Sequence, residues 1–110
     1  MLAVCLFPTQ WKSIAMKVIE LALFKLKADV TEGQFLAALQ DSNRWLANQP
    51  GFIQHRHGVG EEGRMDLVEW ESMTAAKVAA DQFMNAPETQ AYMEVIDLET
   101  VSMRHFQIMS

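Results

Sequence analysis

The stretch GFIQHRHGVGEEGRMDLVEWES, residues 51–72, decides how the rest of the chain folds. Two apolar-patterned runs, Phe52 to Val59 and Arg64 to Glu71, flank a short acidic segment that is rich in glycine. Such a segment between two such runs is typical of a β-hairpin. The stretch therefore predicts two antiparallel strands, and it carries most of the side chains that could do chemistry.

A strand and a helix are predicted ahead of this hairpin. Residues 17–27, KVIELALFKLK, alternate in the manner of a strand. The sequence Thr-Glu-Gly-Gln at 31–34 matches a capping box, in which the first and last side chains satisfy free amides of a starting helix. That helix should end at residues 48–51, Asn-Gln-Pro-Gly, because proline disfavours helix in the residue before it.

The remaining elements follow the hairpin. Ser72 or Thr74 can cap a second helix, and Pro87 starts a further short helix that reaches Ile96. Residues 101–109 form the last predicted strand. The order β-α-β-β-α-β is that of a ferredoxin-like sheet, an α+β fold with its helices on one face.

The first strand is apolar on both faces, and this affects how the sheet is covered. Ile19, Leu21 and Leu23 form a wholly apolar set, which we expect to lie under the helices. The opposite face carries one acidic residue among apolar ones: Val18, Glu20, Ala22, Phe24 and Leu26. No element left in one chain can cover that second face, and burial of apolar area stabilises by roughly 25 cal/mol per Å². We therefore expect a homodimer that forms through the sheet faces.

Composition limits the class of protein. The chain has 110 residues, of which 50% are apolar and 21% charged, as in one soluble globular domain. The net charge is −5 and the basic residues are scattered, which argues against nucleic acid as a partner. Cys5 is the one cysteine, so no intramolecular disulfide can form, and a reducing cytoplasm is the expected location.

Residues 1–15 differ from the regular pattern that starts at Met16. We expect them to be a loosely attached extension of a single domain that spans residues 16–110. No basic residue precedes the short apolar run from Leu2 to Phe7, so a secretory signal is not predicted. No stretch approaches the roughly 20 apolar residues that span a bilayer, and no membrane partner is expected.

Three short motifs carry a resemblance to a known family: Gln49-Pro50-Gly51-Phe52, the strand end Val68 to Ser72, and Asn85-Ala86-Pro87-Glu88. With them, the chain from Met16 to Met109 resembles the dimeric α/β-barrel superfamily, and within it the antibiotic biosynthesis monooxygenase-like domains. The resemblance implies that two sheets pack open face to open face, as a barrel built by two subunits. It also implies that Asp66, Val68 and Trp70 lie inside this barrel.

The chemistry of the family carries over in part. Similar cofactor-free monooxygenases, which oxidise polycyclic aromatic substrates with O₂, place an asparagine four residues before a tryptophan; here the matching residues are Asp66 and Trp70. A tyrosine of such enzymes is replaced by Ala76. Related haem-degrading members use an asparagine at the position of Ala22, and no histidine lies between Glu71 and Arg104 to bind haem. We therefore expect no tightly bound haem, flavin or zinc.

The candidate site lies around the hairpin. If His57 pairs with Arg64, then His55 lies opposite Asp66 on the side of Trp70, whereas a slip of one residue removes that contact. Asp66 and His55 are then the candidate proton-transfer residues, and Asp66 should either pair with a histidine or hold a raised pKa. Trp70 could stack a flat substrate or belong to the core. Further candidates for substrate contact are Phe24, His57 and His105.

Two other interpretations remain open for the polar residues. Glu20 could act as a general base, or it could pair with Arg104 or Lys25 near the dimer interface. His55 and His57, with His105 and a carboxylate, could form a metal site, although hydrogen-bonded histidines near an edge strand are the plainer alternative.

The sequence thus leaves three functions. The first is a small homodimeric oxygenase that needs no cofactor and acts on an aromatic or lipophilic molecule. The second is a non-catalytic dimer of the same fold that binds a small molecule or serves in stress. The third and weakest is a metal enzyme that uses the histidines. One scaffold hosts many activities, so the fold alone does not choose among them.

Overall fold

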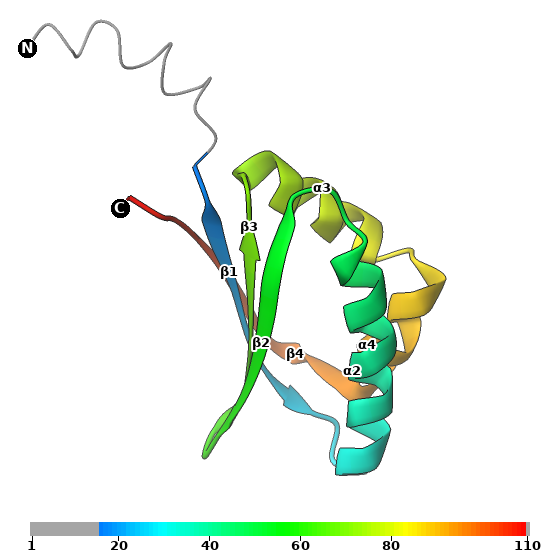
Figure 1. The fold of residues 1–110 in the computed structure, drawn as a ribbon. Helices are drawn as coiled ribbons and strands as arrows, with labels where there is room; N and C mark the ends of the chain where they lie inside the picture. The colour runs from blue at the N-terminus through cyan, green and yellow to red at the C-terminus, as the bar shows by residue number, and fades with distance from the viewer. Residues whose placement is uncertain (1–15, 110) are drawn as a thin grey trace, which may run out of the picture.

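The computed structural model of the chain describes residues 16–109; the predicted extension, residues 1–15, lies outside them. Four strands form one antiparallel sheet in the order β2-β3-β1-β4, and Figure 1 shows the helices packed on one of its faces. The elements are β1 (Val18–Leu26), α2 (Glu32–Ala47), β2 (Phe52–Gly60), β3 (Gly63–Trp70), α3 (Met73–Phe83), η1 (Pro87–Thr89), α4 (Gln90–Val95) and β4 (Ile96–Gln107). The predicted ferredoxin-like fold is confirmed.

Local signals in the sequence set most element ends. The Thr31 side chain accepts from the amide of Gln34, whose own side chain accepts from the Thr31 amide, so the predicted capping box is confirmed. Ser72, and not Thr74, caps α3 through the amide of Ala75. The last strand starts at Ile96, five residues before the predicted Val101, because the chain becomes extended as soon as α4 ends.

Two glycines hold the ends of the hairpin close to other elements. Gly51 has a φ of +84°, and a Cβ there would meet the Ala75 Cβ of α3 at 2.5 Å. Gly63 has a φ of +152°, and a Cβ would lie 2.8 Å from the carbonyl oxygen of Phe24 in β1. Both conformations favour glycine, and neither position has room for a larger residue.

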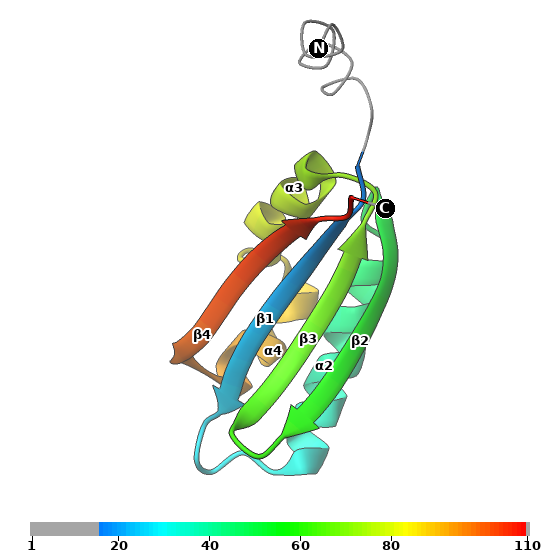
Figure 2. The same cartoon turned by 90° about the vertical axis from the view of Figure 1, so that its left-hand side faces the viewer.

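The two faces of the sheet are the reverse of the sequence prediction. Val18 and Phe24 are fully or almost fully buried beneath the helices, and Glu20 lies with them. Ile19 and Leu21 point to the open face, which Figure 2 shows towards the viewer, and Leu23 on that face is 40% exposed. The prediction was wrong because both faces of β1 are apolar, and because Glu20 under the helices finds hydrogen-bond partners.

The core beneath the helices has two parts. One surrounds Trp70 at the α3 end of the sheet and contains Val18, Leu46, Val68, Ala76 and Ala79. The other surrounds Phe35 and contains Phe24, Ala38, Leu39, Tyr92 and Ile96. Between the two parts, the inner face of the sheet carries polar side chains, which are unusual in an apolar core.

Candidate functional site

A cavity of about 450 Å³ lies between the sheet and the helices. This volume is in the range of small-molecule sites. Its floor comes from the strands and includes Glu20, Ala22, His55, Asp66, Val68 and Trp70. Its roof comes from the helices and includes Leu39, Ser42, Trp45, Phe83, Tyr92 and Met93. The walls are mainly apolar, so the few polar groups in them would fix how a ligand lies.

The resemblance placed Asp66, Val68 and Trp70 inside a barrel between two sheets, and this placement is wrong. All three point under the helices and line the cavity, and each is at most 7% exposed. The alternation of side chains along β3 was predicted correctly. The helices, however, cover the face that was expected to line the barrel. Trp70 is both core and cavity wall, because it is fully buried and still borders the open space.

The register of the hairpin brings two histidines to one carboxylate. His57 lies opposite Asp66, and His55 lies opposite Val68, whereas Val59 and not His57 faces Arg64. The observed register therefore differs by two residues from the one considered from the sequence. A shift of two keeps every side chain on its face, and both histidines reach Asp66.

Asp66 is the centre of a cluster that we call the Asp66 cluster: Asp66, His55, His57 and Tyr92. Its Oδ1 lies 2.9 Å from Nε2 of His55 and 2.7 Å from Nδ1 of His57. The hydroxyl of Tyr92, on α4, donates to Oδ2. Three of the roughly four acceptor positions of this carboxylate are thus in use.

These hydrogen bonds decide the charge of the cluster. Burial by itself favours the neutral carboxylic acid, but the hydrogen bonds from His55, Tyr92 and His57 outweigh it, and the pKa of Asp66 lies below its usual value. Burial, together with the negative Asp66 beside it, raises the pKa of Tyr92. Of the two states that the sequence allowed, Asp66 therefore takes the one in which it is ionised and paired with histidine.

The two histidines differ in what their second nitrogen meets. Nε2 of His57 lies 3.3 Å from Nη1 of Arg64, which can only donate, so His57 is neutral and both of its nitrogens are engaged. Arg64 in turn pairs with Glu32 at the start of α2 and stacks 4.7 Å from the Phe35 ring centre. The hydrogen bond from Arg64 lowers the pKa of Glu32.

His55 keeps one nitrogen for a ligand. Its Nε2 faces the ionised Asp66 and carries the hydrogen, which leaves Nδ1 as an acceptor with no partner among residues 16–109. No side-chain nitrogen or oxygen in this part of the chain is both buried and unpartnered, so Nδ1 is accessible. The imidazole lines the cavity, so the structure offers there a histidine that Asp66 orients and whose second ring nitrogen is not engaged by residues 16–109.

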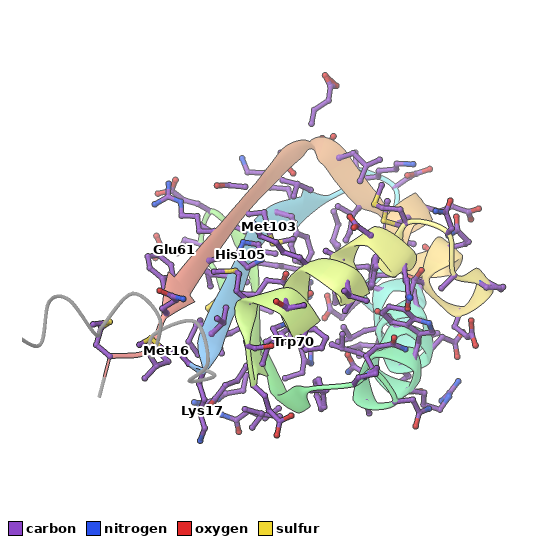
Figure 3. All side chains as sticks on the ribbon, turned by 90° about the horizontal axis from the view of Figure 1, so that it is seen from above. Met16, Lys17, Glu61, Trp70, Met103 and His105 are labelled. Atoms are coloured by element: carbon purple, nitrogen blue, oxygen red, sulfur yellow. The ribbon has the colours of Figure 1, made fainter. Side chains whose placement is uncertain are left out.

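A second group, the Glu20 cluster, consists of Glu20, Trp70 and His105. Nε1 of Trp70 donates to Oε1 of Glu20 at 3.3 Å, and Nε2 of His105 lies 2.8 Å from Oε2. His105 and Met103 belong to β4, and Figure 3 labels both of them together with Trp70. Glu20 therefore pairs with neither Arg104 nor Lys25, which were the partners considered from the sequence.

The histidines do not gather around one point. His105 binds Glu20, whereas His55 and His57 bind Asp66. Among residues 16–109, no group of three or more histidine, cysteine, aspartate or glutamate side chains is placed to hold a metal ion.

The described helices include none that is long and apolar enough to cross a membrane.

Sequence reasoning missed Tyr92, and one signal could have found it. It is the one tyrosine of the chain and lies in a short helix that starts at Pro87. A lone tyrosine on the inner side of such a helix needs a partner for its hydroxyl. Phe24, a predicted substrate contact, lies in the cavity wall. His57 and His105, also predicted contacts, are hydrogen-bonded to Asp66 and Glu20 and are not among the residues that line the cavity.

No protein-family model matches the chain, and no curated protein matches it. Solved structures do match. A mutant of SnoaB, a cofactor-independent oxygenase from Streptomyces nogalater, superposes with a TM-score of 0.70 at 18% identity over 87% of this chain and 96% of that one. A dimeric ferredoxin-like protein of unknown function from Jannaschia sp. CCS1 superposes with a TM-score of 0.64 at 11% identity. The match covers 84% of this chain and 99% of that one.

A third match, hydroxynitrile lyase from Passiflora edulis, has a TM-score of 0.63 at 10% identity and covers 86% of this chain and 94% of that one. The fold is thus that of the antibiotic biosynthesis monooxygenase-like dimeric α/β-barrel proteins. An oxygenase and a lyase share it, so the reaction must be argued from the cavity.

Proposed function

We propose that this chain is a cofactor-independent oxygenase that acts on a flat, lipophilic small molecule bound between the sheet and the helices. The observation that carries the proposal is His55, which lines an apolar cavity, is held by Asp66 through one ring nitrogen, and has no partner among residues 16–109 for the other. The likeness to a cofactor-independent oxygenase supports the same choice.

In the proposed reaction, His55 removes a proton from an enolic or phenolic group of the substrate. Asp66 stays ionised and stabilises the imidazolium that forms. The substrate anion then transfers electrons to O₂, its carbon forms a bond to oxygen, and the His55 imidazolium returns its proton to the peroxide to give a hydroperoxide. Loss of water breaks the O–O bond, so that a CH₂ group becomes C=O and the second oxygen atom leaves as water. All four electrons that reduce O₂ come from the substrate, so no reductant is needed.

Oxygen consumption tests this proposal. The purified chain, in buffer with a chelator and without added flavin or haem, is mixed with two- and three-ring phenols and enolisable ketones in an oxygen electrode. We expect O₂ uptake with at least one compound and a drop of about 10²-fold or more in His55→Gln, the range of a lost general base. Lys77→Gln is the control, because Lys77 is exposed on α3 and is not among the residues that line the cavity.

A non-catalytic binding protein is the second candidate. Two observations favour it: Asp66, at the position of the oxygenase asparagine, is already held by three donors, and Ala76 is fully buried and offers no hydroxyl to the cavity. Tight binding of a phenol without any O₂ uptake, unchanged in His55→Gln, would support this function instead.

We also propose that two copies pair through the open face of the sheet. The apolar residues that this face presents are Ile19, Leu21, Leu23, Met65, Leu67 and Phe106. Phe106 is 50% exposed in one chain, and a sheet face of this kind is costly to leave in water. Sedimentation should find a dimer at micromolar concentration, and a monomer would contradict the proposal.

A matched pair of variants locates the interface. Leu23→Lys places a charge on the open face and should shift the dimer towards monomer. Val78→Lys places the same charge on α3, where Val78 is 46% exposed, and should leave the dimer intact. Equal dissociation by both variants would argue against the sheet face.

A further inference from the structure

The Glu20 cluster borders the cavity, but it has no role in the proposed reaction. Glu20 is 9% exposed and lines the cavity, although two donors already hold its carboxylate. A buried carboxylate in an apolar wall is costly unless it is paired. The hydrogen bonds from Trp70 and His105 offset this cost and fix the positions of the two carboxylate oxygens.

The two carboxylates lie on one diagonal of the floor. Glu20 on β1 faces Val68 on β3, and Ala22 on β1 faces Asp66 on β3. Diagonal neighbours on adjacent strands are roughly 7–8 Å apart. Val68 and Ala22 fill the other diagonal, so a small apolar surface separates the two polar groups. A flat ring system that lies on this surface has a polar group at each end.

The capacity of Glu20 for hydrogen bonds is not exhausted. An ionised carboxylate has about four acceptor positions, and Trp70 and His105 use two of them. Asp66 has three in use and presents His55 to the ligand in its place. Glu20 and Nδ1 of His55 are therefore both acceptors, and each suits a hydroxyl group that donates.

We propose that Glu20, held by His105 and Trp70, is a second polar subsite of the cavity, and that the preferred ligand is a flat apolar molecule with two hydroxyl groups at opposite ends. This inference rests on the proposed function, since it concerns the same ligand. One hydroxyl donates to His55 and the other donates to Glu20, with the rings over Val68, which lies between these two residues in the sheet.

Naphthols test the inference without any assay of turnover. The probes are 2-naphthol, 2,6-dihydroxynaphthalene and 6-methoxy-2-naphthol, and binding to the full chain is measured by calorimetry. We expect the dihydroxy compound to bind about tenfold more tightly than 2-naphthol, the effect of one added hydrogen bond to a charged acceptor. The methoxy compound has the same second oxygen but cannot donate from it, so it should bind no better than 2-naphthol.

Variants show which residue binds the second hydroxyl group of the ligand. Glu20→Gln and His55→Gln should each reduce the tenfold preference to nearly one, because either change leaves a single subsite. Ser42→Ala is the control: Ser42 lines the cavity but belongs to neither cluster, so the preference should remain. The comparison of the three ligands on the unchanged protein keeps the test valid if Glu20→Gln does not fold.

The outcomes separate this inference from the proposed function. A preference that His55→Gln abolishes and Glu20→Gln leaves intact would overturn the second subsite and keep the first. Equal affinity of all three naphthols for the unchanged protein would also overturn it. If none of the naphthols binds at millimolar concentration, both the subsite and the proposed ligand class are wrong.

Discussion

Asp66 and Glu20 lie diagonally across the same two strands, yet their surroundings differ. Asp66 accepts from three side chains that come from β2 and α4, and it holds His55 towards the cavity. Glu20 accepts from two side chains, and its histidine lies on the edge strand β4 with 24% of the side chain exposed. Asp66 is thus an anchor for other groups, whereas Glu20 is itself available to a ligand.

Charge explains why each carboxylate has its own histidine. Two negative charges roughly 7 Å apart repel by about 2 kcal/mol at an effective dielectric constant of 20. A hydrogen-bonded imidazole beside each carboxylate offsets this repulsion. The difference in donor number then predicts how each cluster responds when it is disturbed.

The largest expected effect is on stability. Asp66→Ala leaves two imidazoles and the Tyr92 hydroxyl without their acceptor, so it should lower the free energy of unfolding by about 3 to 5 kcal/mol. Glu20→Ala leaves two donors, one of which can turn to water, and should cost about 1 to 3 kcal/mol. Urea unfolding followed by circular dichroism measures both.

Glu94→Ala is the control for this pair, because Glu94 is exposed on α4 and its side chain makes no hydrogen bond to another described residue. It should change stability much less than either cavity variant. Equal losses for Asp66→Ala and Glu20→Ala would mean that the two clusters do not differ as their hydrogen bonds indicate.

Removal of one donor is the next effect in size. Tyr92→Phe deletes the hydroxyl that donates to Asp66 and should cost about 1 to 2 kcal/mol. It should also raise the pKa of Asp66, since one of the hydrogen bonds that lower it is gone. Unfolding in urea and an NMR titration of the Asp66 carboxyl give the two values.

Wild-type protein provides a check on the same bond. Tyr92 is the one tyrosine of the chain, so tyrosinate absorbance reports on it alone. Because burial raises its pKa, the folded state favours the neutral phenol, and that stability is lost as the pH rises above the ordinary value of about 10. Tyrosinate should therefore appear together with unfolding. A normal titration in the folded protein would contradict the buried hydrogen bond.

The sequence predicted the fold well, because the fold depends on local signals. The capping box at Thr31, the glycine-rich hairpin and the Pro87 turn each act over a few residues. The covered face of the sheet could not be predicted in the same way. Ile19 and Leu21 on one side and Val18 and Phe24 on the other are equally apolar, so which set meets the helices depends on contacts far apart in sequence.

The candidate site was predicted in part for the same reason. Asp66 and His55 share a hairpin, and both the register considered from the sequence and the observed one bring them together. Tyr92 reaches Asp66 from 26 residues away, and His105 reaches Glu20 from 85 residues away. Neither contact leaves a local pattern, so neither was found before the strands and helices were placed.

Acid sensitivity distinguishes the two carboxylates by a smaller effect. The folded-state pKa of Asp66 lies below its usual value of about 3.9, so its contribution to stability is complete above that value and is lost as the pH falls through the folded-state pKa. One such group changes the free energy of unfolding by at most about 1.4 kcal/mol per pH unit. Asp66→Asn should lack this component.

Glu20→Gln is the matched variant for the acid measurement. It keeps Asp66 and its three donors, so it should keep the loss of stability that Asp66 contributes as the pH falls below about 4. Urea midpoints at several pH values measure both variants. If Asp66→Asn and the unchanged protein show parallel pH profiles, the hydrogen bonds to Asp66 do not hold its charge as the structure indicates.

The smallest effect concerns how each cluster meets the solvent. The His105 side chain is 24% exposed, whereas the His57 side chain is 14% exposed and is followed outwards by Arg64 and its partner Glu32, whose side chain is 56% exposed. Glu32→Gln removes a charge that water and salt already screen, so the stability should hardly change. The Arg64 guanidinium would still be held by Phe35 and would still donate to His57.

We therefore expect a small NMR shift of the His57 ring in Glu32→Gln and none of the His105 ring. The same His57 shift should appear when salt is added to the unchanged protein. A larger response of His105 than of His57 would show that the two clusters are coupled through the cavity, and the contrast between Asp66 and Glu20 would then no longer hold.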